Sequence, residues 1–292
     1  MTLIEVTERC CYIDAPAKVG IVRVGDDEVC LIDSGNDKSA GRMIRKLLDA
    51  RGWKLRAIYN THSHADHIGG NRYLQEQTGC RIYAPGAECD LTNHPFLEPS
   101  LLYGGYPFAA LRNKFLQAQE SHAAPLTSDA LPEGFSAIPL PGHALSMVGY
   151  RTPDDVVYLA DSLCSKATLE KYRICFLYDV AAHLQTLDML QHLQGSFFIP
   201  SHAEAAGDVG DLARYNAEQI HTVAESILHH CREGITFETL LSKLFDEYRL
   251  EMTPEQYVLI GSAVRSYLSW LHATGRVQYA IHANRMLWQR NY

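Results

Sequence analysis

The chain has 292 residues, of which 47% are hydrophobic, so it can hold one large domain or two unequal ones with a sizeable core. Its formal net charge of −8 argues against a large nucleic-acid-binding face, which would need clustered Lys and Arg. The sequence contains no run of 18 apolar residues, so it predicts no membrane-spanning helix.

The beginning of the chain predicts a sheet with a covering helix. Asp33 and Ser34 end the last of three strands, and either residue could cap the helix that follows. That helix is expected over residues 39–51, where Met43, Ile44 and Leu47 have the spacing of an amphipathic helix. The three strands are short apolar runs separated by turns, and we expect them at residues 3–13, 19–24 and 29–32.

The stretch Thr61-His62-Ser63-His64-Ala65-Asp66-His67-Ile68-Gly69-Gly70 places three histidines and one aspartate within six positions, directly after a strand predicted over residues 56–60. Histidines two residues apart cannot share one face of a helix, but they can converge from a tight loop. Imidazole nitrogen and carboxylate oxygen together suit zinc or a similar transition metal. We therefore expect a metal-binding loop here, followed by a helix over residues 68–77 and a strand over residues 80–83.

Residues 85–127 are too long for a simple connection and are rich in Gly, Pro and aromatic residues. Long insertions in compact domains are often lids or binding loops. We expect this insertion to form one wall of a substrate pocket, with Tyr103, Tyr106 and Phe108 as candidate substrate contacts. The alternative is that these aromatic side chains form a small core of the insertion itself.

Three more polar residues each follow a short apolar strand. His143 follows residues 135–140, Asp161 follows residues 156–160, and His202 follows residues 197–199. An open α/β sheet places its functional site where such strands end. A loop is expected over residues 162–179, where Lys166, Lys171, Tyr172 and Arg173 could contact an anionic substrate or form an ordinary solvated surface, and where Cys164 is a conceivable but less favoured ligand.

Together these four motifs resemble the signature of the metallo-β-lactamase-fold hydrolases, over residues from about 3 to about 205. The resemblance implies an α/β fold, an αββα sandwich of two mixed β-sheets flanked by helices. It implies one metal ion held by His62, His64 and His143 and a second held by Asp66, His67 and His202, with Asp161 bridging them. Two Zn²⁺ per chain are expected, and Mn or Fe would also suit the site. Asp33 would lie beneath the metal loop and orient its ligands.

The resemblance also implies a metal-dependent hydrolase in which two ions about 3.5–4 Å apart share a hydroxide. Asp66 would orient that hydroxide, so Asp66 and Asp161 are the expected catalytic carboxylates. The expected small-molecule substrate has an acyl bond, in a thioester (as for glyoxalase II), a lactone or a β-lactam. Residues 1–9 lack the pattern of a signal peptide, which disfavours an exported β-lactamase and predicts a cytoplasmic protein.

Other activities on the same fold stay open. The first is an endoribonuclease or phosphodiesterase, and the second is an iron-dependent oxidoreductase such as a persulfide dioxygenase. Flavodiiron proteins are disfavoured because they have Glu where this chain has His64. A non-catalytic binding module is disfavoured by the complete ligand set. A purely structural zinc site is disfavoured because such sites have four protein ligands and are usually rich in Cys.

The composition shifts after residue 211, and we predict a hydrolase domain over residues 1–211 and a helical C-terminal domain over residues 212–292. Three helices and a hairpin are expected there, in an order that weakly resembles the winged-helix segment of some lactamase-like hydrolases and ribonucleases. Eight basic and eight acidic residues from residue 212 onward make nucleic acid an unlikely partner. A structural or dimerising role is favoured, with a homodimer as the expected assembly. The predicted elements are at residues 212–232, 237–248, 254–274 and 277–289.

Overall fold

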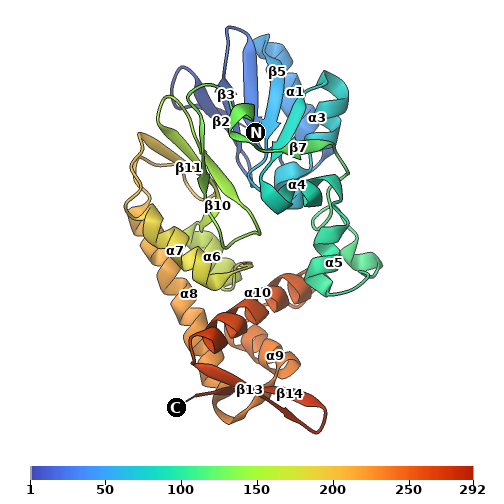
Figure 1. Cartoon of the computed structure of the whole chain (residues 1–292), viewed down its shortest axis with the longest axis vertical. Coiled ribbons are helices and arrows are strands. Elements are labelled where there is room, and N and C mark those ends of the chain that lie inside the picture. Colours follow the sequence, from blue (N-terminus) through green and yellow to red (C-terminus); the bar gives the residue numbers. More distant parts are fainter. Residues whose placement is uncertain (1, 292) are drawn as a thin grey trace.

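The N-terminal half of the chain forms a seven-stranded mixed sheet (Figure 1). The structure is a computed structural model that describes residues 2–291. Strands β1 to β4 pair antiparallel and strands β4 to β7 pair parallel, so the sheet changes direction at β4. Its strands, in spatial as well as chain order, are β1 (Thr2–Glu5), β2 (Cys10–Asp14), β3 (Val19–Arg23), β4 (Glu28–Ile32), β5 (Lys54–Tyr59), β6 (Arg81–Ala84) and β7 (Ala123–Pro125).

The single strand predicted over residues 3–13 is wrong, because the chain folds back within it. The backbone N–H groups of Val6 and Thr7 both donate to the carbonyl oxygen of Cys10, which makes a tight turn between β1 and β2. The Thr7 hydroxyl also accepts from the backbone N–H of Cys10. A local turn of this kind leaves the apolar pattern of a strand intact on both sides.

Helices α1 (Lys38–Arg51) and α3 (Asn71–Thr78) cover the outer face of this sheet, where Ile44 and Leu48 pack against strand residues such as Leu31. The cap of α1 is Asp37, whose Oδ1 accepts from the N–H groups of Ser39 and Ala40. The predicted cap at Asp33 or Ser34 is therefore wrong, and Asp33 is left available for the site described below.

A second mixed sheet has the order β11-β10-β9-β8 and packs against the first. Tyr59 of the first sheet and Tyr150 and Tyr158 of the second lie buried between them. Helices α7 and α8 cover the outer face of the second sheet, which completes the predicted αββα sandwich. The elements of this half are β8 (Ser136–Pro139), β9 (Val148–Arg151), β10 (Val156–Cys164), β11 (Phe197–His202), α7 (Val180–Leu190) and α8 (Gly210–His230).

The insertion at residues 85–127 has secondary structure of its own. Its last segment joins the first sheet as β7, which pairs parallel with β6. The predicted loop at residues 162–179 likewise contains a short helix, α6 (Lys166–Tyr172). The short helices of the insertion and of the segment after it are α4 (Gly86–Asn93), α5 (Leu97–Tyr103), η1 (Ala109–Leu111) and η2 (Ser128–Ala130).

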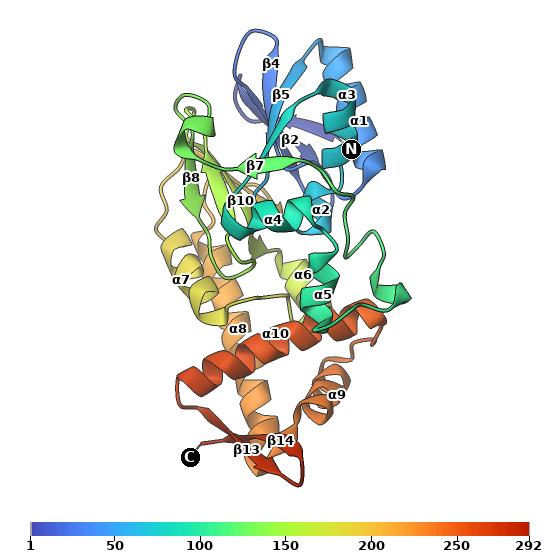
Figure 2. The ribbon, with the colours of Figure 1, turned by 45° about the vertical axis from the view of Figure 1, so that its right-hand side comes forward.

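The C-terminal part leans against the insertion. Both views show α10 next to α5 (Figures 1 and 2), where Val258 packs with Leu102 and Leu111. The Asn113 side chain donates to Glu255 at 2.8 Å across the same contact. A small sheet of order β12-β14-β13 closes this part. Its elements are η3 (Cys231–Glu233), β12 (Ile235–Thr236), α9 (Phe237–Tyr248), α10 (Pro254–Ala273), β13 (Val277–His282) and β14 (Arg285–Arg290).

The larger assembly of the chain stays a matter of prediction. The buried core of the second sheet continues through α8 into α10, across the predicted boundary at residues 211 and 212. The two-domain division, the winged-helix likeness, the homodimer and the cytoplasmic location remain predictions.

Across residues 2–291, none of the helices combines the length and apolar character needed to cross a bilayer.

Candidate metal centre

The metal loop leaves the end of β5 and turns at once into a short helix, α2 (Ala65–Ile68). The helix predicted over residues 68–77 is therefore split, and α2 begins inside the motif. Gly69 follows it where a Cβ atom would lie 2.3 Å from the backbone carbon of Asn36. Only glycine permits this close approach, which places the loop against the segment that follows β4.

The structure brings the first predicted ligand group together. The Nδ1 atom of His64 lies 3.0 Å from Nε2 of His62 and 3.0 Å from Nε2 of His143. Oδ2 of Asp161 lies 3.4 Å from Nε2 of His143. One ligand atom from each of the four residues lies within 4.8 Å of the others, which is close enough to hold one ion.

The second group meets the first at Asp161. Nε2 of His67 lies 3.0 Å from Oδ1 of Asp161, and Nε2 of His202 lies 3.1 Å from its Oδ2. Oδ2 of Asp66 is 3.2 Å from Nε2 of His202. These four ligand atoms also lie within 4.8 Å of one another, so Asp161 is common to both groups.

Two atoms of the second group are buried without a hydrogen-bond partner, namely Nε2 of His67 and Oδ1 of Asp161. Although they lie 3.0 Å apart, they do not have the geometry of a hydrogen bond. Buried polar atoms in proteins are nearly always paired, so such atoms need an explanation. A metal ion between them would satisfy both, and the donor set therefore fits a transition metal.

Asp161 is placed by an irregular strand. The prediction that the strand ends at residue 160 is wrong, because β10 continues to Cys164. Ala160 has a left-handed φ of 50°, and the pairing of β10 with β11 shifts register on both sides of it. This bulge re-aims the next side chain, Asp161, toward the metal loop.

Asp33 lies beneath the metal loop and is 2% exposed. Its Oδ2 accepts from Nδ1 of His67 at 2.7 Å and from the Thr61 hydroxyl at 2.7 Å, while Oδ1 accepts from the Thr61 N–H. Nδ1 of His202 likewise donates to the carbonyl oxygen of Pro16 at 2.7 Å. Each bond directs the opposite nitrogen, Nε2, toward the site.

Glu88, on α4 of the insertion, supports the site in a way that the sequence did not predict. It is fully buried and accepts from the Ser63 N–H at 3.0 Å, from the Ser63 hydroxyl at 2.6 Å and from the Ser146 N–H at 2.8 Å. One carboxylate thus joins the loop of His62 and His64 to the loop that follows His143. No spacing in the sequence links Glu88 to either loop.

The two ligand groups differ in charge. Burial lowers the pKa of His62 well below its ordinary value and that of His143 to about 3, so both imidazoles are neutral and ready to coordinate. Burial alone would also lower the pKa of His202, but the carboxylates of Asp161 and Asp66 outweigh this effect and raise the pKa of His202 to about 10. A cluster that favours an imidazolium between two carboxylates is also suited to a divalent cation.

The family model described as "Metallo-beta-lactamase superfamily" matches residues 14–202, which include all seven of these side chains. The chain belongs to the metallo-beta-lactamase superfamily. The family predicted from the H-x-H-x-D-H motif is thereby confirmed, and this membership supports an enzyme of the hydrolase class.

Among curated members of the superfamily, the chain is similar over short stretches to hydroxyacylglutathione hydrolases. It is 31% identical over 121 residues to the protein from Cereibacter sphaeroides, which is 41% of this chain and 38% of that protein. It is 40% identical over 68 residues to the protein from Methylococcus capsulatus, which is 23% of this chain and 26% of that protein. The chain thus matches less than two fifths of the length of either relative.

Two solved structures of the superfamily share the fold over nearly the whole chain. A metallo-beta-lactamase family protein from Thermus thermophilus superposes with a TM-score of 0.72 at 19% identity, over 97% of this chain and 98% of that one. A beta-lactamase domain protein from Burkholderia ambifaria gives 0.72 at 16% identity, over 99% and 93%. These likenesses extend over the C-terminal part as well as the αββα sandwich.

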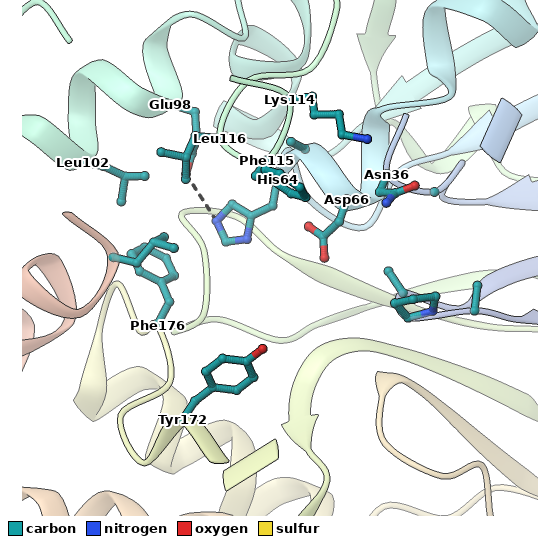
Figure 3. A pocket seen from close by; sticks show the side chains of 16 residues that line it. Asn36, His64, Asp66, Glu98, Leu102, Lys114, Phe115, Leu116, Tyr172 and Phe176 are labelled. Atoms are coloured by element: carbon teal, nitrogen blue, oxygen red, sulfur yellow. Dashed lines mark ion pairs between the residues drawn. The ribbon is translucent and has the colours of Figure 1, made fainter. Parts of the chain in front are cut away.

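In this member of the superfamily a cavity of about 500 Å³ opens directly on His64 and Asp66 (Figure 3). The insertion walls it, but not through the aromatic residues predicted. On α5, Glu98 and Leu102 share the inward face because they are four residues apart, and both line the cavity. Tyr103 and Phe108 are exposed and contact each other edge to face, with their ring centroids 5.6 Å apart, and neither of these candidate substrate contacts lines the cavity.

Tyr106 is also outside this cavity, with 80% of its surface exposed. Of the predicted contacts after Asp161, only Tyr172 lines the cavity, and its hydroxyl points into it (Figure 3). Lys166 and Lys171 lie over the rings of Tyr215 and Tyr172. Sγ of Cys164 contacts Sγ of Cys175 at 3.3 Å and belongs to neither ligand group.

Proposed function

We propose that this chain is a metal-dependent hydrolase that cleaves an acyl bond, with thioesters as the first substrate class to test. The observation that carries the proposal is a carboxylate, Asp161, shared by two ligand groups, each of which also places a residue, His64 or Asp66, on the wall of a cavity. Each ion would have three ligands of its own and share the fourth, Asp161, and the cavity gives water or substrate access to both groups, unlike the closed site of a structural zinc.

The seven side chains would hold the two ions as the two groups indicate: His62, His64 and His143 on one side, Asp66, His67 and His202 on the other, with Asp161 between them. When bound, a pair of divalent ions supplies Lewis acidity and a water that ionises near neutral pH. The buried unpaired atoms of His67 and Asp161 support this assignment. Zinc is the proposed metal, because nitrogen and carboxylate ligands suit it.

The residues of the chain have separate roles in this proposal. Asp66 lies at the edge of the cavity with 41% of its side chain exposed, so its carboxylate can orient an attacking water. Asp161 is 8% exposed and is out of reach of a substrate, so its role is to hold the two ligand groups together. Thioesters come first because the curated relatives are named hydroxyacylglutathione hydrolases, although only part of their length is matched.

The direct experiment is a substrate panel of thioesters, lactones, β-lactams, phosphodiesters and RNA, tested with zinc-, manganese- and iron-loaded protein. The proposal predicts turnover of acyl substrates with zinc. Cleavage of phosphodiesters or RNA alone would instead support the nuclease alternative. Oxidation of a persulfide by the iron-loaded protein alone would support the oxidoreductase alternative.

His62→Ala tests the metal centre itself. Removing a neutral, fully buried ligand should lower activity by more than the roughly 10- to 100-fold that loss of an outer partner of a ligand costs. Metal content, measured by atomic emission, should fall with activity. The far-UV circular dichroism should persist, because the change empties a polar site and not the apolar core.

The matched control for this change is His122→Ala, an exposed histidine on the insertion that belongs to neither ligand group. It should retain metal and activity. Retention of both by His62→Ala as well would rule out this centre as the source of activity.

A further inference from the structure

The wall of the cavity beside the metal centre is mostly apolar. Leu102 and Leu116 come from the insertion, and Phe176 follows α6 (Figure 3). Leu259 of α10 completes this part of the wall. The volume of about 500 Å³ lies within the range of roughly 300–1,000 Å³ typical of small-molecule sites. A second, smaller cavity of about 160 Å³ shares Leu102 and Phe176 with the first and is also mostly apolar.

The charged groups of this wall leave no free cation for a substrate. Of the described residues that line the 500 Å³ cavity, Lys114 is the only Lys or Arg. Its Nζ lies 3.0 Å from Oδ2 of Asp37, which also caps α1. The two carboxylates of the wall are Asp66, a proposed ligand, and Glu98, whose Oε1 lies 3.5 Å from Nε2 of His64.

The electrostatics of the wall therefore disfavour an anionic substrate group. A glutathione thioester carries two carboxylates, and burying either without a cation would cost free energy. Apolar groups, in contrast, gain free energy in proportion to the area they remove from water.

We propose that the substrate carries an uncharged alkyl or aryl acyl group of medium length, which the apolar wall binds next to the metal centre. This inference rests on the proposed acyl hydrolysis and gives it a substrate class. It differs from the reaction for which the curated relatives are named.

The C-terminal part has a direct share in this recognition. Leu259 is half-buried and reaches the cavity, while its neighbour Val258 anchors α10 to Leu102 and Leu111. The sequence favoured a structural or dimerising role for this part. In the structure, this part also contributes to the wall of the cavity. Changes in α10 should therefore alter selectivity.

The test is a series of N-acetylcysteamine thioesters with acetyl, butanoyl, hexanoyl and octanoyl groups, compared with S-lactoylglutathione. Burying each methylene should raise kcat/KM by roughly fourfold, so burial of about three or four of the added methylenes should make octanoyl exceed acetyl by about 100-fold. Binding of the matching ketone analogues, which cannot be hydrolysed, should tighten with chain length in calorimetry.

Leu259→Lys should lower the octanoyl-to-acetyl ratio of kcat/KM by at least about 10-fold and weaken octanoyl ketone binding, because it places a charge in the apolar wall. The matched control is Met252→Lys, the same change at a side chain that is 48% exposed and lies outside both cavities. This control should keep the ratio of the parent protein.

The outcomes separate this inference from the proposed function. A rate that is flat with chain length, or highest for S-lactoylglutathione, would overturn the inference and leave acyl hydrolysis standing. Length-dependent binding of the ketones without turnover of any thioester, lactone or β-lactam would support the apolar pocket and contradict the proposed function.

Discussion

Asp161→Ala is expected to lose both metal ions and to reduce acyl hydrolysis by far more than about 100-fold, the upper end of the usual cost of losing an outer partner of a ligand. Asp161 is the only residue among the described ones that belongs to both ligand groups. Its removal also leaves His67 and His202 without the carboxylate that both face. Metal content by atomic emission and turnover of a thioester measure the effect.

Asp161→Asn separates charge from shape in this prediction. It keeps the size of the side chain but removes the charge, so it should also lose metal. The control is Asp188→Ala, which removes an exposed carboxylate on α7 and should keep both ions. One retained ion with near-parental turnover in Asp161→Ala would contradict the shared position of this carboxylate.

Glu88→Gln is expected to destabilise the fold and loosen the site together. The carboxylate accepts three hydrogen bonds in a fully buried position, and an amide cannot accept all three. Leaving one or two buried donors unpaired should lower the free energy of unfolding by about 2–4 kcal/mol. Zinc affinity should fall about 10- to 100-fold, because Ser63 lies between two metal ligands.

Thermal unfolding and a zinc titration against a chelator measure the two effects of Glu88→Gln. Asp90→Asn is the matched control, because it makes the same chemical change at an exposed position on the same helix, α4. Loss of stability at unchanged zinc affinity would show that Glu88 supports the insertion alone and does not position the metal loop.

The convergence of the candidate ligands could be predicted from the sequence because each of them lies in a short motif beside a strand. The residue types of the H-x-H-x-D-H motif restrict the chemistry, and the strands bring His143, Asp161 and His202 to the same edge. The bulge at Ala160 had no local signal in the sequence, because its left-handed φ accompanies register shifts in the pairing with β11, which is distant in the chain.

The insertion was harder to predict, because its contacts are long-range. Tyr103 was a candidate pocket residue for its aromatic ring, yet the turn of α5 directs Glu98 and Leu102 inward instead. The role of Glu88 depends on two loops distant in the chain. Likewise, nothing near Leu259 in the sequence indicates that α10 reaches the cavity.

Anomalous diffraction from crystals grown with zinc tests the shared two-ion centre most directly. The account predicts two zinc peaks, one at about 2.0–2.2 Å from ligand atoms of His62, His64 and His143 and the other at the same distance from those of Asp66, His67 and His202, with Asp161 beside both. A single zinc enclosed by four protein side chains, or His143, Asp161 or His202 turned away from the motif, would contradict it.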